Sequence, residues 1–168
     1  MESSVLDPSV IAINSGSGVM IFDFESDFAG SLRCIPMITR QKLDVVGIKL
    51  SLRQWSRFSR EERGTLTELS CEMPDEQSAY RAFVLQLISE RSDEQPTYLL
   101  TQNFDDWRRN DRMPESVKVQ SSADDVPPPT AEQWATLTPL QRFSLIKLAR
   151  STHENENFVP AMTEFGIL

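Results

Sequence analysis

The stretch SLRQWSRFSREERGTLTEL, residues 51–69, decides the fold, because the chain contains a second version of it. Residues 130–148, TAEQWATLTPLQRFSLIKL, align with this stretch without a gap. The positions that are identical in the two copies are Gln54/Gln133, Trp55/Trp134, Arg63/Arg142, Leu66/Leu145 and Leu69/Leu148. A repeat of this kind indicates that the chain builds one local structure twice.

Each copy has the pattern of a helical corner. Two residues that favour helix starts are separated by a short turn carrying a Trp, and the second of them opens a longer helix. These helix-capping residues are Ser51 and Ser59 in the first copy and Thr130 and Thr138 in the second. We therefore expect two similar corners, with Trp55 and Trp134 as buried anchors at equivalent positions.

Outside the corners, apolar spacing predicts helices over residues 31–46 and 74–91, and a last long helix over 139–148. Pro36 either opens the first of these helices or kinks it, and Gly47 supplies a left-handed end. Residues 19–25 alternate as an extended segment or short strand does, and residues 92–129 look like a short helix ending near Trp107 followed by a long connection.

The predicted fold is mainly α, a single-domain helical bundle with two similar helical corners and at most short strands. Residues 1–18, which include NSGSG, should form a flexible N-terminal arm, and residues 19–168 a single helical domain. No apolar run approaches the roughly 18 residues of a membrane span, and the start MESSVLDPSV carries acids where a targeting peptide carries Lys or Arg. These features predict a cytoplasmic protein whose two cysteines are reduced thiols.

The net charge of −8 argues against nucleic acid or an anionic membrane as partner, but the charge is segregated. Residues 31–63 contain eight Lys or Arg against three acids, whereas residues 72–129 contain six against twelve. Two interpretations are open: solvated helix faces that neutralise one another, or a basic docking face for an acidic protein or cofactor. The docking interpretation assigns partner contacts to Arg33, Arg40, Lys42, Arg53 and Arg57.

Catalytic patterns are weak, which predicts a protein that is no enzyme and needs no cofactor. The single histidine, His153, lies in a polar HENEN context, and the carboxylates occur in surface-like runs. Cys34 has two interpretations. Its position next to Arg33 and near a helix start is typical of a reactive thiol or a metal ligand, with Cys71 or His153 as a further ligand. A cysteine flanked by apolar residues, as Cys34 is, is more often a small core residue.

Several motifs carry a resemblance to a known family. LRCIPM (residues 32–37), KLD with GIKL (42–50) and HENENF (153–158) are unusual in combination, and over residues 21–168 the chain resembles the nitrate-reductase-associated protein family of cyanobacteria and some other bacteria. The resemblance implies an accessory role and nitrate reductase as the partner.

These observations lead to one principal hypothesis and two alternatives. The principal one is a non-enzymatic accessory or maturation factor that binds assimilatory nitrate reductase and helps to activate or stabilise it. The alternatives are a metal or iron–sulfur handling protein that uses Cys34, and a small enzyme of a kind that the sequence does not show.

Overall fold

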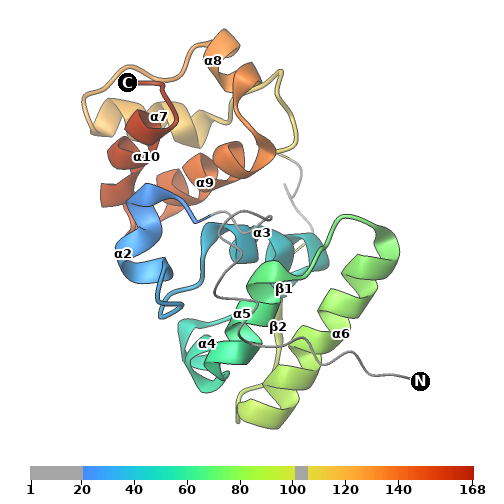
Figure 1. Cartoon of the computed structure of the whole chain (residues 1–168). Helices are drawn as coiled ribbons and strands as arrows, with labels where there is room; N and C mark the ends of the chain where they lie inside the picture. Colours follow the sequence, from blue (N-terminus) through green and yellow to red (C-terminus); the bar gives the residue numbers. More distant parts are fainter. Residues whose placement is uncertain (1–20, 101–105) are drawn as a thin grey trace. The chain divides into compact units, whose positions relative to one another are not determined.

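The computed structural model describes residues 21–100 and 106–168, and over these residues the predicted mainly α fold is confirmed (Figure 1). The described strands, β1 (Ile48–Lys49) and β2 (Thr97–Tyr98), form one small antiparallel sheet. The predicted arm, residues 1–18, lies outside the described residues.

The described chain divides into two compact units. The N-terminal unit contains Phe28–Leu99, and the C-terminal unit contains Phe22–Asp27 with Leu100–Leu168. The division falls inside the short helix α2 (Ser26–Ala29). A single domain over residues 19–168 stays a prediction.

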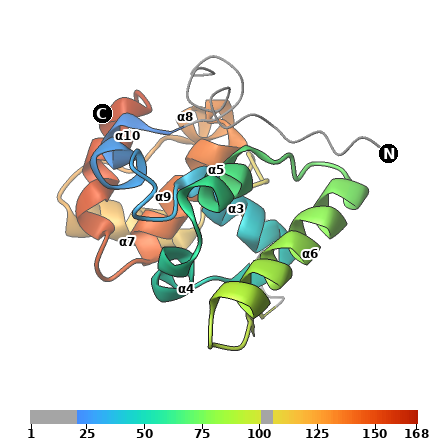
Figure 2. The ribbon, with the colours of Figure 1, turned by 60° about the horizontal axis from the view of Figure 1, so that its bottom comes forward.

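The N-terminal unit consists of four helices and the small sheet. The helices are α3 (Met37–Val46), α4 (Leu52–Arg57), α5 (Arg60–Glu68) and α6 (Pro74–Arg91). The long helix α6 packs against α3 and α4, and Figure 2 shows it next to α3. The core between these elements includes Leu43, Trp55, Phe58, Leu66, Tyr80, Val84 and Ile88.

The C-terminal unit repeats this order of helices. Its elements are the 3-10 helix η1 (Asp23–Glu25), α7 (Glu115–Ala123), α8 (Ala131–Thr136), α9 (Pro139–Arg150), the 3-10 helix η2 (Asn155–Asn157) and α10 (Phe158–Glu164). Helices α7 and α10 both pack against α9. The apolar residues buried in this unit include Val117, Trp134, Phe143, Leu145, Phe158 and Met162.

Three predicted segments need correction. The extended segment at 19–25 is wrong over its described part, because Asp23–Glu25 is a 3-10 helix whose Glu25 carboxylate accepts the N–H of Phe22 at 3.4 Å. The short helix predicted to end near Trp107 is also wrong over its described part, because Thr97–Tyr98 is a strand and residues 106–108 form a turn; residues 101–105 lie outside the described residues. The long connection after Trp107 contains α7, a helix that the sequence did not predict.

The structure decides between the two interpretations of Pro36. Helix α3 begins at Met37, and Pro36 is its N-cap residue in an extended conformation with φ −61° and ψ 153°. The proline therefore opens the helix and does not kink it. Gly47 ends the helix as predicted, with a φ of 74° that residues with a side chain rarely adopt.

The two predicted corners are present and share their capping hydrogen bonds. In the first corner the hydroxyl of Ser51 accepts the N–H of Gln54 at 3.0 Å, and the Gln54 side chain accepts the N–H of Ser51 at 3.1 Å. Thr130 and Gln133 make the same reciprocal pair, at 3.1 and 2.9 Å. Both tryptophans are buried as predicted, since Trp55 is 0% and Trp134 1% exposed.

The repeated Gln–Trp pair also ties together the ends of each unit. The indole of Trp55 donates to the carbonyl of Leu32, ahead of α3, at 2.8 Å, and the Gln54 amide donates to the carbonyl of Gln95, after α6, at 3.4 Å. In the C-terminal unit Trp134 donates to Arg109, ahead of α7, at 3.2 Å, and Gln133 donates to Ile167, after α10, at 3.2 Å. One short helix thus holds the segment that enters its unit and the segment that leaves it.

The repeated arginines satisfy backbone carbonyls at the end of the short helix. Arg63 donates from Nε to the carbonyl of Phe58 at 3.0 Å, and Arg142 donates to the equivalent carbonyl of Leu137. The last carbonyls of a helix have no partner within the helix. Each arginine therefore completes the turn between the two helices of its corner.

The burial of Tyr80 can be tested by measuring how the free energy of unfolding depends on pH. Its hydroxyl donates to the carbonyl of Leu66 at 2.7 Å, and burial raises the pKa of Tyr80. A tyrosine ionises near pH 10 in an unfolded chain, so the unfolded state loses this proton first and stability falls above about pH 10. The difference in unfolding free energy between wild type and Tyr80→Phe should therefore change by about 1.4 kcal/mol per pH unit there. Urea unfolding at pH 8 to 11.5 measures it, and a constant difference would contradict the burial.

Candidate functional site

The first corner exposes one side of the short helix α4. Gln54, Trp55 and Phe58 point into the core, which leaves the intervening positions in solvent. We call these positions the cationic corner face: Leu52, Arg53, Ser56, Arg57 and Arg60. Leu52 is 54% exposed, so the face combines an apolar side chain with three arginines.

Three of the five predicted partner contacts lie at or beside this face. The side chain of Arg53 is 75% exposed and pairs with Glu94 at 3.3 Å, an exposed ion pair of the kind that contributes little to stability. Arg57 is exposed and forms no ion pair within residues 21–100 and 106–168. Arg33 is exposed and follows Leu32, whose carbonyl is bound by Trp55, so its backbone lies next to the corner.

The other two predicted contacts are used inside the unit. Arg40 donates from Nε to the carbonyl of Ile35 at 3.0 Å. Lys42 donates from Nζ to the carbonyl of Thr67 at 2.6 Å, and burial lowers the pKa of its ammonium group. Their donor groups support the backbone, so the geometry favours Arg33, Arg53 and Arg57 as the contacts available to a partner.

The second corner offers the matching surface without positive charge. At the positions of the cationic corner face it has Ala131, Glu132, Ala135, Thr136 and Pro139, all exposed. Both corners keep the same caps, Trp and Arg, so the fold does not need arginines on this surface. The cationic corner face is therefore a property of the first copy alone.

The candidate thiol and its possible co-ligands differ in burial and belong to both units. Cys34 is partly buried and Cys71 is buried, both as free thiols in the N-terminal unit, while His153 belongs to the C-terminal unit. Burial raises the pKa of the Cys71 thiol. Within the described ranges, no group of three or more His, Cys, Asp or Glu side chains is arranged to hold a metal ion.

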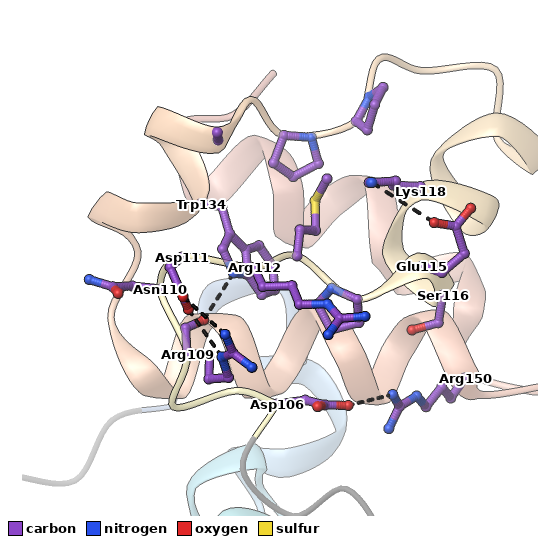
Figure 3. Close-up of a pocket in the computed structure, with 15 residues that line it drawn as sticks. Asp106, Arg109, Asn110, Asp111, Arg112, Glu115, Ser116, Lys118, Trp134 and Arg150 are labelled. Carbon is purple, nitrogen blue, oxygen red and sulfur yellow. Dashed lines mark hydrogen bonds and ion pairs between the residues drawn. The ribbon is translucent and has the colours of Figure 1, made fainter.

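A pocket that sequence reasoning missed lies in the C-terminal unit (Figure 3). Its volume is about 860 Å³, and Trp134, Pro128 and Pro129 form part of its wall. Its basic residues are Arg109, Arg112, Lys118 and Arg150, and its acidic residues are Asp106, Asp111 and Glu115. The sequence gives little sign of it, because these residues come from the turn before α7, from α7 itself and from the end of α9.

The geometry defines a class of protein: a small helical protein of two compact units that each contain one such corner, with a cationic face on one of the corners. The helices of the described part include none that is long and apolar enough to cross a membrane. The chain belongs to the conserved nitrate reductase-associated protein family, whose model matches residues 21–165, and the resemblance seen in the sequence is thereby confirmed. No curated protein and no solved structure matches the chain.

Proposed function

We propose that the protein is a non-catalytic accessory factor that binds nitrate reductase and helps to activate or stabilise it in the cytoplasm. The family description names an association with nitrate reductase. The observation that carries the proposal is the cationic corner face, which the first corner has and its structural copy lacks. The partner surface would be an acidic patch of the reductase.

The chemistry of the face suits protein docking. Arginine side chains form bidentate hydrogen bonds with carboxylates, and Arg53 and Arg57 lie one helical turn apart on α4. Leu52 adds an apolar contact beside them. The short helix is fixed by Trp55 and the caps, so little ordering is needed when the partner binds. Complementary charge would mainly increase the rate of association.

Neutralising the face tests this function. The variant Arg53→Gln with Arg57→Gln should weaken association with purified nitrate reductase by about tenfold or more at low salt, and the loss should shrink as ionic strength rises. Binding is measured by surface plasmon resonance, and reductase activity is assayed in parallel with and without the accessory protein. A thermal unfolding curve like that of the wild type shows that the variant is folded.

The second corner supplies a matched control. Ala135→Glu with Thr136→Glu lowers the net charge by the same amount as the arginine variant, at the positions equivalent to Ser56 and Arg57. This control should bind the reductase as the wild type does. Equal binding by all three proteins would refute the proposed face, and equal weakening of both variants would show that only total charge matters. If the wild type does not bind the reductase at all, the proposed function itself fails.

A further inference from the structure

The pocket of the C-terminal unit contains a guanidinium group, that of Arg112, that forms no ion pair within the described residues, although, beside the hydrogen bond from Arg109, its charge helps to lower the pKa of the neighbouring Asp111 carboxyl. Arg109 forms two hydrogen bonds with Asp111, at 3.1 and 3.0 Å, and Arg150 pairs with Asp106 at 3.1 Å. Lys118 lies 3.9 Å from Glu115. Arg112 forms no hydrogen bond and no ion pair with the residues that the structure describes. The pairs account for the three acids of the pocket and leave one positive charge.

A buried hydroxyl without a partner lies opposite this charge. The Oγ atom of Ser116 is shielded from solvent and forms no hydrogen bond with the residues that the structure describes. Among these residues it is the one buried side-chain oxygen or nitrogen of this kind. Figure 3 shows Arg112 and Ser116 pointing toward one another, with Arg150 at the pocket's lower edge. A buried polar atom without a partner costs free energy, and a bound water, ion or ligand group is one way to offset that cost.

The first turn of α7 adds donors at the same place. Helix α7 has nine residues, Pro114 is its N-cap residue, and no side chain caps its first turn. The first backbone N–H groups of a helix lack partners within the helix and favour negative charge. Ser116 belongs to this turn. Arg112, the Ser116 hydroxyl and the start of α7 therefore present hydrogen-bond donors to one region of the pocket.

The N-terminal unit shows that this polar set is not required by the fold. Pro36 and Pro114 are the N-cap residues of the corresponding helices α3 and α7. Counted from these prolines, Cys34 takes the place of Arg112 and Ile38 that of Ser116. The N-terminal unit thus forms its equivalent helix start with uncharged side chains, and the charge and hydroxyl are particular to the C-terminal unit.

We propose that this pocket binds a small molecule through an oxyanion group, a phosphate monoester or a carboxylate. The oxyanion accepts hydrogen bonds from the guanidinium of Arg112 and the hydroxyl of Ser116 at the start of α7. The pocket volume of about 860 Å³ is within the usual range for small-molecule sites, so the rest of the ligand fits beside Trp134. Asp106 and Asp111 limit the number of negative charges that the ligand can carry.

Titration of the full-length protein with simple probes tests the site. We expect saturable shifts of the backbone NMR signals of Arg112 and Ser116 with inorganic phosphate, glycerol 3-phosphate or acetate as probe. A response to the phosphates alone assigns the site to phosphate monoesters, and a response to acetate as well assigns it to oxyanions in general. Shifts that grow linearly without saturation, or that spread evenly over surface arginines, would overturn the proposal.

Three variants localise the binding. Arg112→Gln should weaken the affinity for the probe that binds by about tenfold or more, and Ser116→Ala by a smaller factor. Arg57→Gln removes an unpaired arginine from the other unit and should leave the affinity unchanged. Unchanged affinity in Arg112→Gln, with its NMR spectrum showing a folded protein, would also overturn the site. The result does not depend on reductase binding, so the two proposals can fail separately.

Discussion

Replacing Trp55 or Trp134 by Ala should lower the free energy of unfolding by about 3–5 kcal/mol, the usual cost of removing a fully buried large side chain. Each tryptophan fills the centre of its corner, with exposures of 0% and 1%. Urea unfolding followed by far-UV circular dichroism measures the loss without relying on tryptophan fluorescence. A loss below about 1 kcal/mol would contradict the anchoring role.

Substitution by Phe separates the hydrogen bond of each tryptophan from its packing. The carbonyl of Leu32 accepts from Trp55 at 2.8 Å and also from Arg63 at 3.2 Å. The carbonyl of Arg109 accepts from Trp134 at 3.2 Å, and among the described residues no second donor is seen. Trp55→Phe leaves its carbonyl with a partner, so Trp134→Phe should be the more destabilising of the two.

Arg142→Met should cost about 3 kcal/mol or more of unfolding free energy, since hydrogen bonds to charged groups contribute about 1.5–3 kcal/mol each. Arg142 is 5% exposed and donates to the carbonyls of Leu137 and of Trp107, the latter at 2.8 Å. Burial lowers the pKa of its guanidinium, which remains charged at neutral pH. Methionine retains about the length of the aliphatic part of arginine but cannot donate to either carbonyl.

Arg63 is the matched comparison for Arg142. It donates to the carbonyls of Phe58 at 3.0 Å, Leu32 at 3.2 Å and Ser56 at 3.2 Å, but it is only partly buried, so water can replace some of these bonds. Arg63→Met should therefore destabilise the protein less than Arg142→Met does, as measured by urea unfolding. The reverse order, or equal losses, would show that burial does not set the cost.

Local signals made the corners predictable from sequence. Ser51, Ser59, Thr130 and Thr138 cap helices through bonds to residues three positions along the chain, so the pattern alone specifies them. Pro36 and Gly47 act through their own backbone angles. Helix α7 was missed because Val117 and Val119 alternate as in a strand and serines weaken the helical pattern.

Features that depend on distant parts of the chain could not be read from the sequence. Alignment of the two copies shows that Arg63 and Arg142 are equivalent. Their acceptors could not be predicted, because an acceptor such as the carbonyl of Trp107 for Arg142 lies far away along the chain. The same holds for the pocket, which combines Asp106 with Arg150. Arg40 and Lys42 looked like surface charge, and only the folded structure shows their donors engaged with carbonyls. Charge counting cannot separate such residues from Arg57.

Both ends of each unit are hydrogen-bonded to two adjacent residues of one short helix. These residues are Gln54 and Trp55 in the N-terminal unit and Gln133 and Trp134 in the C-terminal unit. When such a segment is duplicated within a gene, the copy retains the hydrogen bonds that hold its two ends together. Tandem copying can then lengthen a chain without new contacts having to evolve first at the junction. Once two copies exist, one can keep the shared framework while its exterior accumulates new residues, as the contrast between Arg57 and Thr136 illustrates.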